Sequence, residues 1–204
     1  MPQTYSTQAI VLNRRPIKEA DSRVSLYTLD YGRLDLLVKG ARKLSSKLSG
    51  HVEPFNLLEV MVISGRQAYA GGTLSRNCYL GIKSDFDKLE AAGYAFNRFN
   101  KLIKEGVSDE TLFYLLSDFL ALLDHVSAEA AWYRWLSQLF LCKALHHLGF
   151  GFNASPTADA EIISFLTKLS DMPLYEAAKR TWPRSKLQRA SRIAGHWIEA
   201  VTER

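Results

Sequence analysis

The strongest constraint on the fold is a change in hydrophobic period near residue 80. From Thr7 to Tyr79, short apolar runs alternate with polar residues and are separated by turn residues, a pattern typical of β-strands. From Asp85 onward, apolar residues recur at three- and four-residue steps, which is the period of an amphipathic helix. The chain is therefore expected to place a β domain at residues 1–80 and an α-helical domain at residues 81–204.

Five short strands are expected in the first domain, and the turns between them are visible in the sequence. They fall at residues 9–12, 24–29, 34–38, 55–63 and 72–79. The first strand is expected to end in a turn or loop at Asn13–Pro16, and Asp30–Gly32 is expected to close a hairpin. Five strands of this length suit a small closed barrel, of which the OB-fold is the commonest five-stranded form. An SH3-like barrel is the alternative, and periodicity does not separate the two.

The second domain is expected to be a helical bundle. One helix is expected from Phe86 to Ile103, a second begins at a cap on Ser108 or Asp109, and a third begins at a cap on Ser127. The third runs to Gly149 and is apolar on nearly every face, which predicts a place at the centre of the bundle. Two more helices are expected near residues 158–170 and 185–202, after a loop at residues 153–156. The expected fold class is α+β, an OB-fold barrel followed by an α-helical bundle.

Positive charge is concentrated in the first domain. Residues 1–80 hold 11 Lys and Arg against 6 Asp and Glu, a net charge of +5, whereas residues 81–204 hold 15 of each. A focused basic field favours a polyanionic partner, either nucleic acid or an anionic membrane. No apolar run is long enough to span a bilayer, no secretory signal is visible, and the two cysteines, Cys78 and Cys142, match neither a disulfide framework nor a zinc pattern. A reducing cytoplasm is the expected location.

A basic stretch from Val38 to Gly50 is the most informative segment. Its cations are Lys39, Arg42, Lys43 and Lys47, and no acidic residue occurs between Val38 and Val52. Cationic side chains of this kind displace the counterions of a phosphate backbone, and nearby hydroxyls and amides donate to phosphate oxygens. A solvated basic loop without a ligand explains the charge alone equally well.

A family resemblance rests on the order and spacing of several motifs. They are Glu19-x-Asp21, Tyr31-Gly32, Val38-Lys39-Gly40-Ala41-Arg42, Lys47-Leu48 and Pro54-Phe55. This series resembles the N-terminal signature of the RecO family, and Gln8–Leu12 resembles that family's opening strand. Phe140 with Leu145-x-x-Leu148-Gly149-Phe150 is similar to the end of its long central helix. The resemblance extends from about residue 7 to residue 152.

The resemblance implies a DNA repair and recombination mediator without catalytic activity, cytoplasmic and associated with the nucleoid. Such a protein binds single- and double-stranded DNA, anneals complementary strands and, with RecR, promotes loading of RecA on DNA coated by single-stranded-DNA-binding protein (SSB). It implies DNA contacts at Lys39, Arg42, Lys43 and Lys47, supplemented by Arg14, Arg15, Arg23 and Arg33. It also implies that the acidic SSB C-terminal tail binds the third helix, at Arg134, Gln138, Cys142, Leu145 and Leu148.

The residues themselves add two candidates and leave some questions open. Tyr69 is the preferred stacking platform for a nucleobase, and Arg66 close to it is a further expected DNA contact. A second basic stretch at residues 179–192 has six cations, and it is either an extension of a DNA path, a contact for an acidic partner, or a solvated face. Residues 152–171 lack the four cysteines that many RecO-like sequences carry, so neither zinc nor another cofactor is expected. An RNA-binding OB protein of the translation apparatus and a non-catalytic basic scaffold at a membrane surface are the alternative functions.

Overall fold

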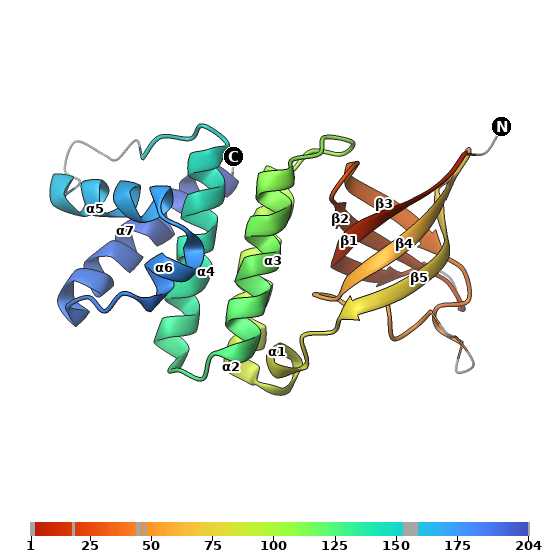
Figure 1. Cartoon of the computed structure of the whole chain (residues 1–204), viewed down its shortest axis with the longest axis horizontal. Coiled ribbons are helices and arrows are strands. Elements are labelled where there is room, and N and C mark those ends of the chain that lie inside the picture. Colours follow the sequence, from red (N-terminus) through yellow and green to blue (C-terminus); the bar gives the residue numbers. More distant parts are fainter. Residues whose placement is uncertain (1–2, 18, 44–45, 47, 153–158, 204) are drawn as a thin grey trace. The chain divides into compact units, whose positions relative to one another are not determined.

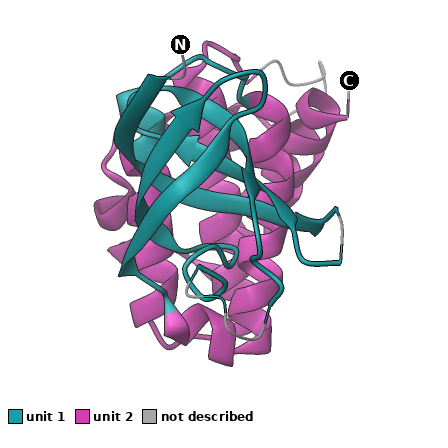
Figure 2. Cartoon of the chain, turned by 90° about the vertical axis from the view of Figure 1, so that its right-hand side faces the viewer, with its two compact units in different colours: residues 1–79, 103–113 teal, residues 80–102, 114–204 magenta. Residues whose placement is uncertain are grey.

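The structure is a computed structural model that describes residues 3–17, 19–43, 46, 48–152 and 159–203. Its internal contacts divide the chain into two compact units (Figure 2). Unit 1 comprises residues 1–79 and 103–113, and unit 2 comprises residues 80–102 and 114–204. The segment 103–113 thus belongs with the β domain although it lies beyond residue 80 in the chain.

Unit 1 is a closed five-stranded barrel. Its strands are β1 (Gln3–Pro16), β2 (Ser22–Thr28), β3 (Gly32–Val38), β4 (Leu57–Ser64) and β5 (Tyr69–Asn77), labelled in Figure 1. They follow the order β1-β2-β3-β5-β4 around the barrel, and β1 pairs with β4 to close it. All neighbours are antiparallel except β3 and β5, which pair in parallel at Leu37 and Tyr69. This topology confirms the OB-fold and removes the SH3-like alternative.

The course of β1 differs from the expectation. Asn13–Pro16 was expected to form a turn, but these residues continue β1 and pair with β2 as far as Pro16 opposite Ser22. An irregularity in register between Val11 and Asn13 marks a β-bulge, which bends the strand. The bend lets the first half of β1 pair with β4 and its second half with β2, so one strand closes the barrel. The polar residues that suggested a turn are half-buried or exposed in this strand.

The alternation that predicted the strands also describes the barrel core. Its inward side chains are fully or almost fully buried and come from every strand and from the β3–β4 connection; they include Val11, Val24, Leu36, Val52, Val60 and Ala70. The 103–113 segment packs on the β2–β3 end, where the Gly106 N–H donates to the Arg33 carbonyl (3.2 Å). Gly32 is required there, because its φ is +65° and a Cβ would lie 2.1 Å from the Val107 carbonyl oxygen.

Unit 2 is a helical bundle organised by α4, as expected. Its helices are α1 (Leu80–Ser84), α2 (Phe86–Leu102), most of α3 (Glu110–His125), α4 (Ala130–His147), α5 (Ala160–Asp171), α6 (Leu174–Lys179) and α7 (Arg184–Thr202). Every residue of α4 from Trp135 to Leu145 is buried. The Phe140 ring stacks on Phe119 of α3 (ring centres 4.7 Å apart) and also contacts Phe99 of α2 (5.5 Å). In Figure 1, α5, α6 and α7 lie on the other side of α4 from α2 and α3.

The helix ends agree with the expectations only in part. Asp109 caps α3, since its carboxylate accepts from the Leu112 N–H (3.0 Å). Ser127 does not cap α4, which begins after Glu129 without a side-chain cap, and the short helix α6 was not expected. The loop expected at residues 153–156 lies outside the described residues.

The buried cation Lys143 stabilises the bundle. The Lys143 ammonium on α4 donates to the carbonyl oxygens of Ser170 (2.6 Å), Leu169 and Met172 at the C-terminal end of α5. These carbonyls have no partner within their helix, and the negative end of the helix dipole favours a cation beside them. Burial nevertheless lowers the pKa of Lys143, because it penalises the charged form more than the nearby Asp171 carboxylate favours it.

Candidate nucleic-acid interface

The β3–β4 connection, residues 39–56, is held to the barrel by Arg14. The Arg14 guanidinium donates to the Ala41 carbonyl (2.9 Å) and the Ser49 carbonyl (3.1 Å), and it pairs with the Glu53 carboxylate. Its Nε also lies 3.3 Å from the Ser22 hydroxyl. Only 15% of the Arg14 side chain is exposed. Sequence reasoning placed Arg14 among the DNA contacts, whereas in the structure its Nη atoms bond residues of the connection and its Nε bonds Ser22 of β2.

The first turn of this connection is tied to the β1–β2 loop. The Gly40 N–H donates to the Asp21 carboxylate (2.9 Å), and the Arg42 N–H donates to the Ala20 carbonyl (3.0 Å). Gly40 has a φ of +66°, a conformation that glycine adopts without strain. The Glu19-x-Asp21 motif and the Lys39-Gly40-Ala41-Arg42 motif therefore contact each other. Their hydrogen bonds anchor the first turn of the connection.

The far end of the connection is fixed in the same way. The Val11 N–H donates to the Asn56 carbonyl and the Phe55 N–H donates to the Val11 carbonyl, each at 2.9 Å. Phe55 adopts a φ of +73°, which is rare for an aromatic residue. The Asn56 side-chain amide donates back to the carbonyls of Gly50 and His51. Both ends of the connection are thus built into the barrel wall.

Five exposed cations gather at the end of the barrel where β1 ends, β2 begins and β3 ends; they are Arg15, Arg23, Lys39, Arg42 and Lys43. Arg15 and Arg23 are directly opposite each other in the β1–β2 ladder. Among the described residues, neither has an ion pair with a carboxylate. Like charges placed directly opposite destabilise a sheet, so a bound polyanion would relieve a repulsion that the folded barrel contains. We call these five residues the basic rim.

A shallow hollow of about 500 Å³ lies beside the basic rim. Arg42, Ser22 and Ser49 contribute donors to its lining, and Arg14, Pro16, Glu53 and Pro54 complete it. Its one carboxylate, Glu53, is paired with Arg14. Guanidinium and hydroxyl groups around an open hollow suit a phosphate group.

Tyr69 and Lys39, predicted separately as a stacking platform and a phosphate contact, lie together. The Lys39 ammonium is 5.1 Å from the centre of the Tyr69 ring, a cation–π arrangement. The parallel pairing of β3 with β5 produces this contact, because it places Tyr69 beside Leu37. Arg66 is exposed in the β4–β5 turn, three residues before Tyr69.

Arg33, another predicted DNA contact, does not join the rim. Arg33 lies at the opposite end of β3, six residues or roughly 20 Å from Lys39 along the strand. Its guanidinium is 3.9 Å from the Asp35 carboxylate. Lys47 lies outside the described residues.

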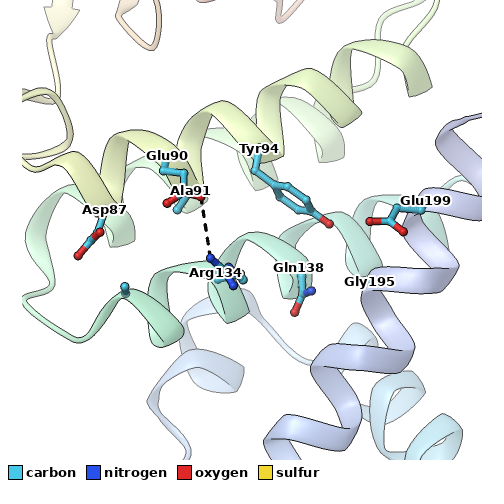
Figure 3. A pocket seen from close by; sticks show the side chains of 9 residues that line it. Asp87, Glu90, Ala91, Tyr94, Arg134, Gln138, Gly195 and Glu199 are labelled. Atoms are coloured by element: carbon cyan, nitrogen blue, oxygen red, sulfur yellow. Dashed lines mark ion pairs between the residues drawn. The ribbon is translucent and has the colours of Figure 1, made fainter.

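The residues predicted to bind the SSB tail are separated by the structure. Arg134 and Gln138 line a hollow of about 300 Å³ between α2, α4 and α7 (Figure 3). Three carboxylates line the same hollow, those of Asp87, Glu90 and Glu199, and Glu90 lies 3.9 Å from Arg134. Gln138 is itself buried, and its amide donates to the Ser191 carbonyl (3.1 Å).

Cys142 and Leu145 are fully buried in the bundle core, so they are not available to a peptide on the surface. Burial also raises the pKa of the Cys142 thiol. Leu148 is exposed just after the end of α4. The three- and four-residue spacing of the five predicted tail contacts placed them along one line of the α4 surface. Because α4 is the central helix of the bundle, it is buried on almost every side.

Neither a metal site nor a membrane span is found in the described ranges. No three His, Cys, Asp or Glu side chains converge there as metal ligands. None of the helices described is both long and apolar enough to cross a bilayer.

The closed barrel and its basic rim define an OB-fold protein with a cationic face. Residues 1–71 match the family model described as the recombination protein O N-terminal domain. The chain is 33% identical over 124 residues to the DNA repair protein RecO of Geobacter metallireducens, covering 60% of this chain and 50% of that protein. It is 32% identical over 120 residues to that of Desulforamulus reducens (58% and 47%) and 32% identical over 145 residues to that of Geobacter sulfurreducens (70% and 58%).

Residues 1–71 therefore match the RecO family model, and the chain is similar to RecO proteins over 58–70% of its length in these comparisons. It spans about half the length of the curated relatives that it matches. The matches agree with the motifs at residues 8–55, whose structural roles are the barrel closure and the anchoring of the β3–β4 connection.

Proposed function

We propose that this protein is a DNA repair and recombination mediator that binds single- and double-stranded DNA on the basic rim and anneals complementary strands. The observation that supports the proposal most is the rim itself, in which five exposed cations from three chain segments gather at one end of a rigid OB barrel. OB barrels bind single strands through a cationic groove and stacking aromatics. Tyr69, held beside Lys39, supplies such an aromatic ring.

The rim would promote annealing by neutralising charge. Two complementary strands repel each other through their phosphates, and cations that displace condensed counterions reduce this repulsion. The contacts are to the backbone and carry no sequence information, as annealing of arbitrary sequences requires. No group on the rim needs to change its covalent state for this function.

A salt titration of single-strand binding tests the role of the rim. The triple variant Lys39→Ala/Arg42→Ala/Lys43→Ala should reduce the slope of log K against log salt by roughly 2, at about 0.7 for each cation removed from a phosphate. A matched variant should leave the slope almost unchanged, because it removes three exposed lysines elsewhere, Lys101, Lys104 and Lys168. Equal slopes for the two variants would show that the rim does not bind DNA.

We further propose that unit 2 binds the SSB C-terminal tail, with Arg134 as the contact to its carboxylates. The carboxylates that line the hollow around Arg134 would weaken such a contact. Removing one of them should therefore change the binding of the peptide. Arg134→Ala should reduce binding of a fluorescent acidic tail peptide, and Glu90→Gln should strengthen it, because the competing carboxylate 3.9 Å away is removed. If both variants bind the peptide like the unmodified protein, the tail does not bind in this hollow.

RecR and RecA are the remaining proposed partners. The proposal expects this protein and RecR together to accelerate RecA filament formation on SSB-coated single strands. Neither protein alone should do so. The rim variant should lose the effect in the same assay, and a variant that retained it would separate mediation from DNA binding on the rim.

A further inference from the structure

A second aromatic and cationic groove lies in unit 2, between the first half of α4 and the first half of α7. It encloses about 520 Å³, within the range of roughly 300–1,000 Å³ that is usual for ligand sites. Its lining includes Trp132 and Trp135 from α4, Trp182 from the preceding loop, and Arg184, Leu187 and Arg192 from α7. We call it the tryptophan groove. It is separate from the hollow around Arg134.

Three of the four tryptophans in the chain line this groove. The fourth, Trp197, is buried and packs on Phe152. Trp132 and Trp182 are only half-buried. The Trp182 indole N–H has no hydrogen-bond partner within the described part of the chain, although a buried donor of this kind usually has one. The Trp182 ring makes a T-shaped contact with Phe165 (ring centres 4.8 Å apart), and the exposed parts of the two half-buried indoles favour a ligand with flat rings.

The charges of the basic stretch at residues 179–192 are divided by the fold. Lys186 lies 2.9 Å from the Glu161 carboxylate, and Arg189 pairs with Asp159, both on the α5 side. Arg184 and Arg192 are exposed and line the groove instead. They are eight residues apart, so their backbones are about 12 Å apart along the helix axis. They could therefore contact different phosphates of one strand.

The start of α7 adds to this positive potential. Pro183 is the N-cap and supplies no side-chain hydrogen bond to the first helical N–H groups. The N-terminal end of a helix of 19 residues carries a partial positive charge that favours anions. Glu129 is the one carboxylate in the lining. The groove thus combines ring faces with separated cations, the arrangement by which proteins bind single strands without sequence preference.

We propose that the tryptophan groove binds a segment of single-stranded nucleic acid, with bases stacked on Trp132 and Trp182 and phosphates paired with Arg184 and Arg192. This proposal extends the proposed function and rests on it, because annealing would supply the single strand that the groove binds. An annealing protein must hold two strands, and a site in each unit would allow one strand to be held independently of the other. The groove also gives the basic stretch at residues 179–192 a specific role.

Photo-crosslinking locates the strand directly. The probe is an oligo-dT in which some thymines are replaced by 5-iodo-deoxyuridine, irradiated with the full chain and followed by peptide mapping. We expect adducts on Trp132 or Trp182 in addition to adducts in unit 1. Adducts confined to unit 1 would overturn the proposal and leave DNA binding on the rim intact. If the chain does not bind the probe at all, the proposed function fails as well.

A pair of matched variants tests the cations. Arg184→Ala/Arg192→Ala should abolish the adducts in unit 2 and lower the salt slope of binding by about 1.4. Lys186→Ala/Arg189→Ala removes the same charge from the same helix but on its paired side, and it should retain both. Equal effects of the two variants would show that only net charge matters, which contradicts a site in the groove.

The competing occupant is an acidic peptide with an aromatic residue. A fluorescent peptide of this composition is therefore titrated against the protein that carries the rim variant Lys39→Ala/Arg42→Ala/Lys43→Ala. The proposal expects oligo-dT to retain weak binding to this protein and to displace any bound peptide. Peptide binding that depends on Arg184 and Arg192, without oligo-dT binding, would overturn it.

Discussion

Arg14 offers the most informative perturbation of the barrel, because its hydrogen bonds hold the β3–β4 connection that carries Arg42 and Lys43. Arg14→Ala removes the donors to the Ala41 and Ser49 carbonyls and the partner of Glu53. A hydrogen bond from a charged donor contributes about 1.5–3 kcal/mol. The half-buried Ser49 carbonyl can bond water once the side chain is gone, the buried Ala41 carbonyl loses its donor, and the pair with half-exposed Glu53 adds little. The expected cost is therefore about 2–3 kcal/mol, less than the sum of the bonds.

Hydrogen exchange of the β3–β4 connection measures this cost. The amides of His51, Val52 and Asn56 are bonded to carbonyls within the connection, so their exchange reports its opening. A destabilisation of about 2 kcal/mol makes exchange roughly 30-fold faster. Arg15→Ala is the control, because Arg15 is the exposed neighbour with the same charge.

The two variants should also differ in DNA binding. Arg14→Ala should weaken affinity by loosening the segment that carries Arg42 and Lys43, yet leave the salt slope near its original value. Arg15→Ala should lower the slope by about 0.7 without faster exchange. If exchange in the connection is the same in both variants, Arg14 does not hold it and our account of the site is wrong.

Two further predictions concern the buried helix α4. Lys143→Met should lower the free energy of unfolding by about 1–3 kcal/mol at neutral pH, because the C-terminal carbonyls of α5 lose their buried donor. The pKa of Lys143 is lowered in the folded state, so the unfolded chain binds the proton more tightly. The stability advantage of the unmodified protein over this variant should therefore grow as the pH rises towards 10.5. Urea titrations at several alkaline pH values measure this advantage, and a constant or shrinking difference would refute the prediction. Half-buried Cys78 should react with Ellman's reagent in the native protein, whereas buried Cys142 should react only in denaturant, and two reactive thiols in the native state would contradict the burial of α4.

The amino-acid sequence by itself determined the kinds of element and their order. The change of period near residue 80 predicted a barrel before a bundle, since alternation and helical recurrence follow from the local geometry of a buried face. The same local reasoning identified α4 as a central helix and named Ser108 or Asp109 as the cap of α3, of which the structure uses Asp109. The basic rim was visible as charge, because most of its cations lie within a few residues of Lys39.

The tertiary structure alone decided which of these residues act together. Arg14 and Arg15 are adjacent and chemically identical, but the fold buries one against the β3–β4 connection and exposes the other. Cys142 and Leu145 shared a helical line with Arg134, and only the packing of neighbouring helices shows that they are core. The same holds for Arg184 and Arg189, of which one lines a groove and the other is paired. Burial and pairing depend on what other segments bring to a side chain, and contacts between distant segments leave no local pattern in a single sequence.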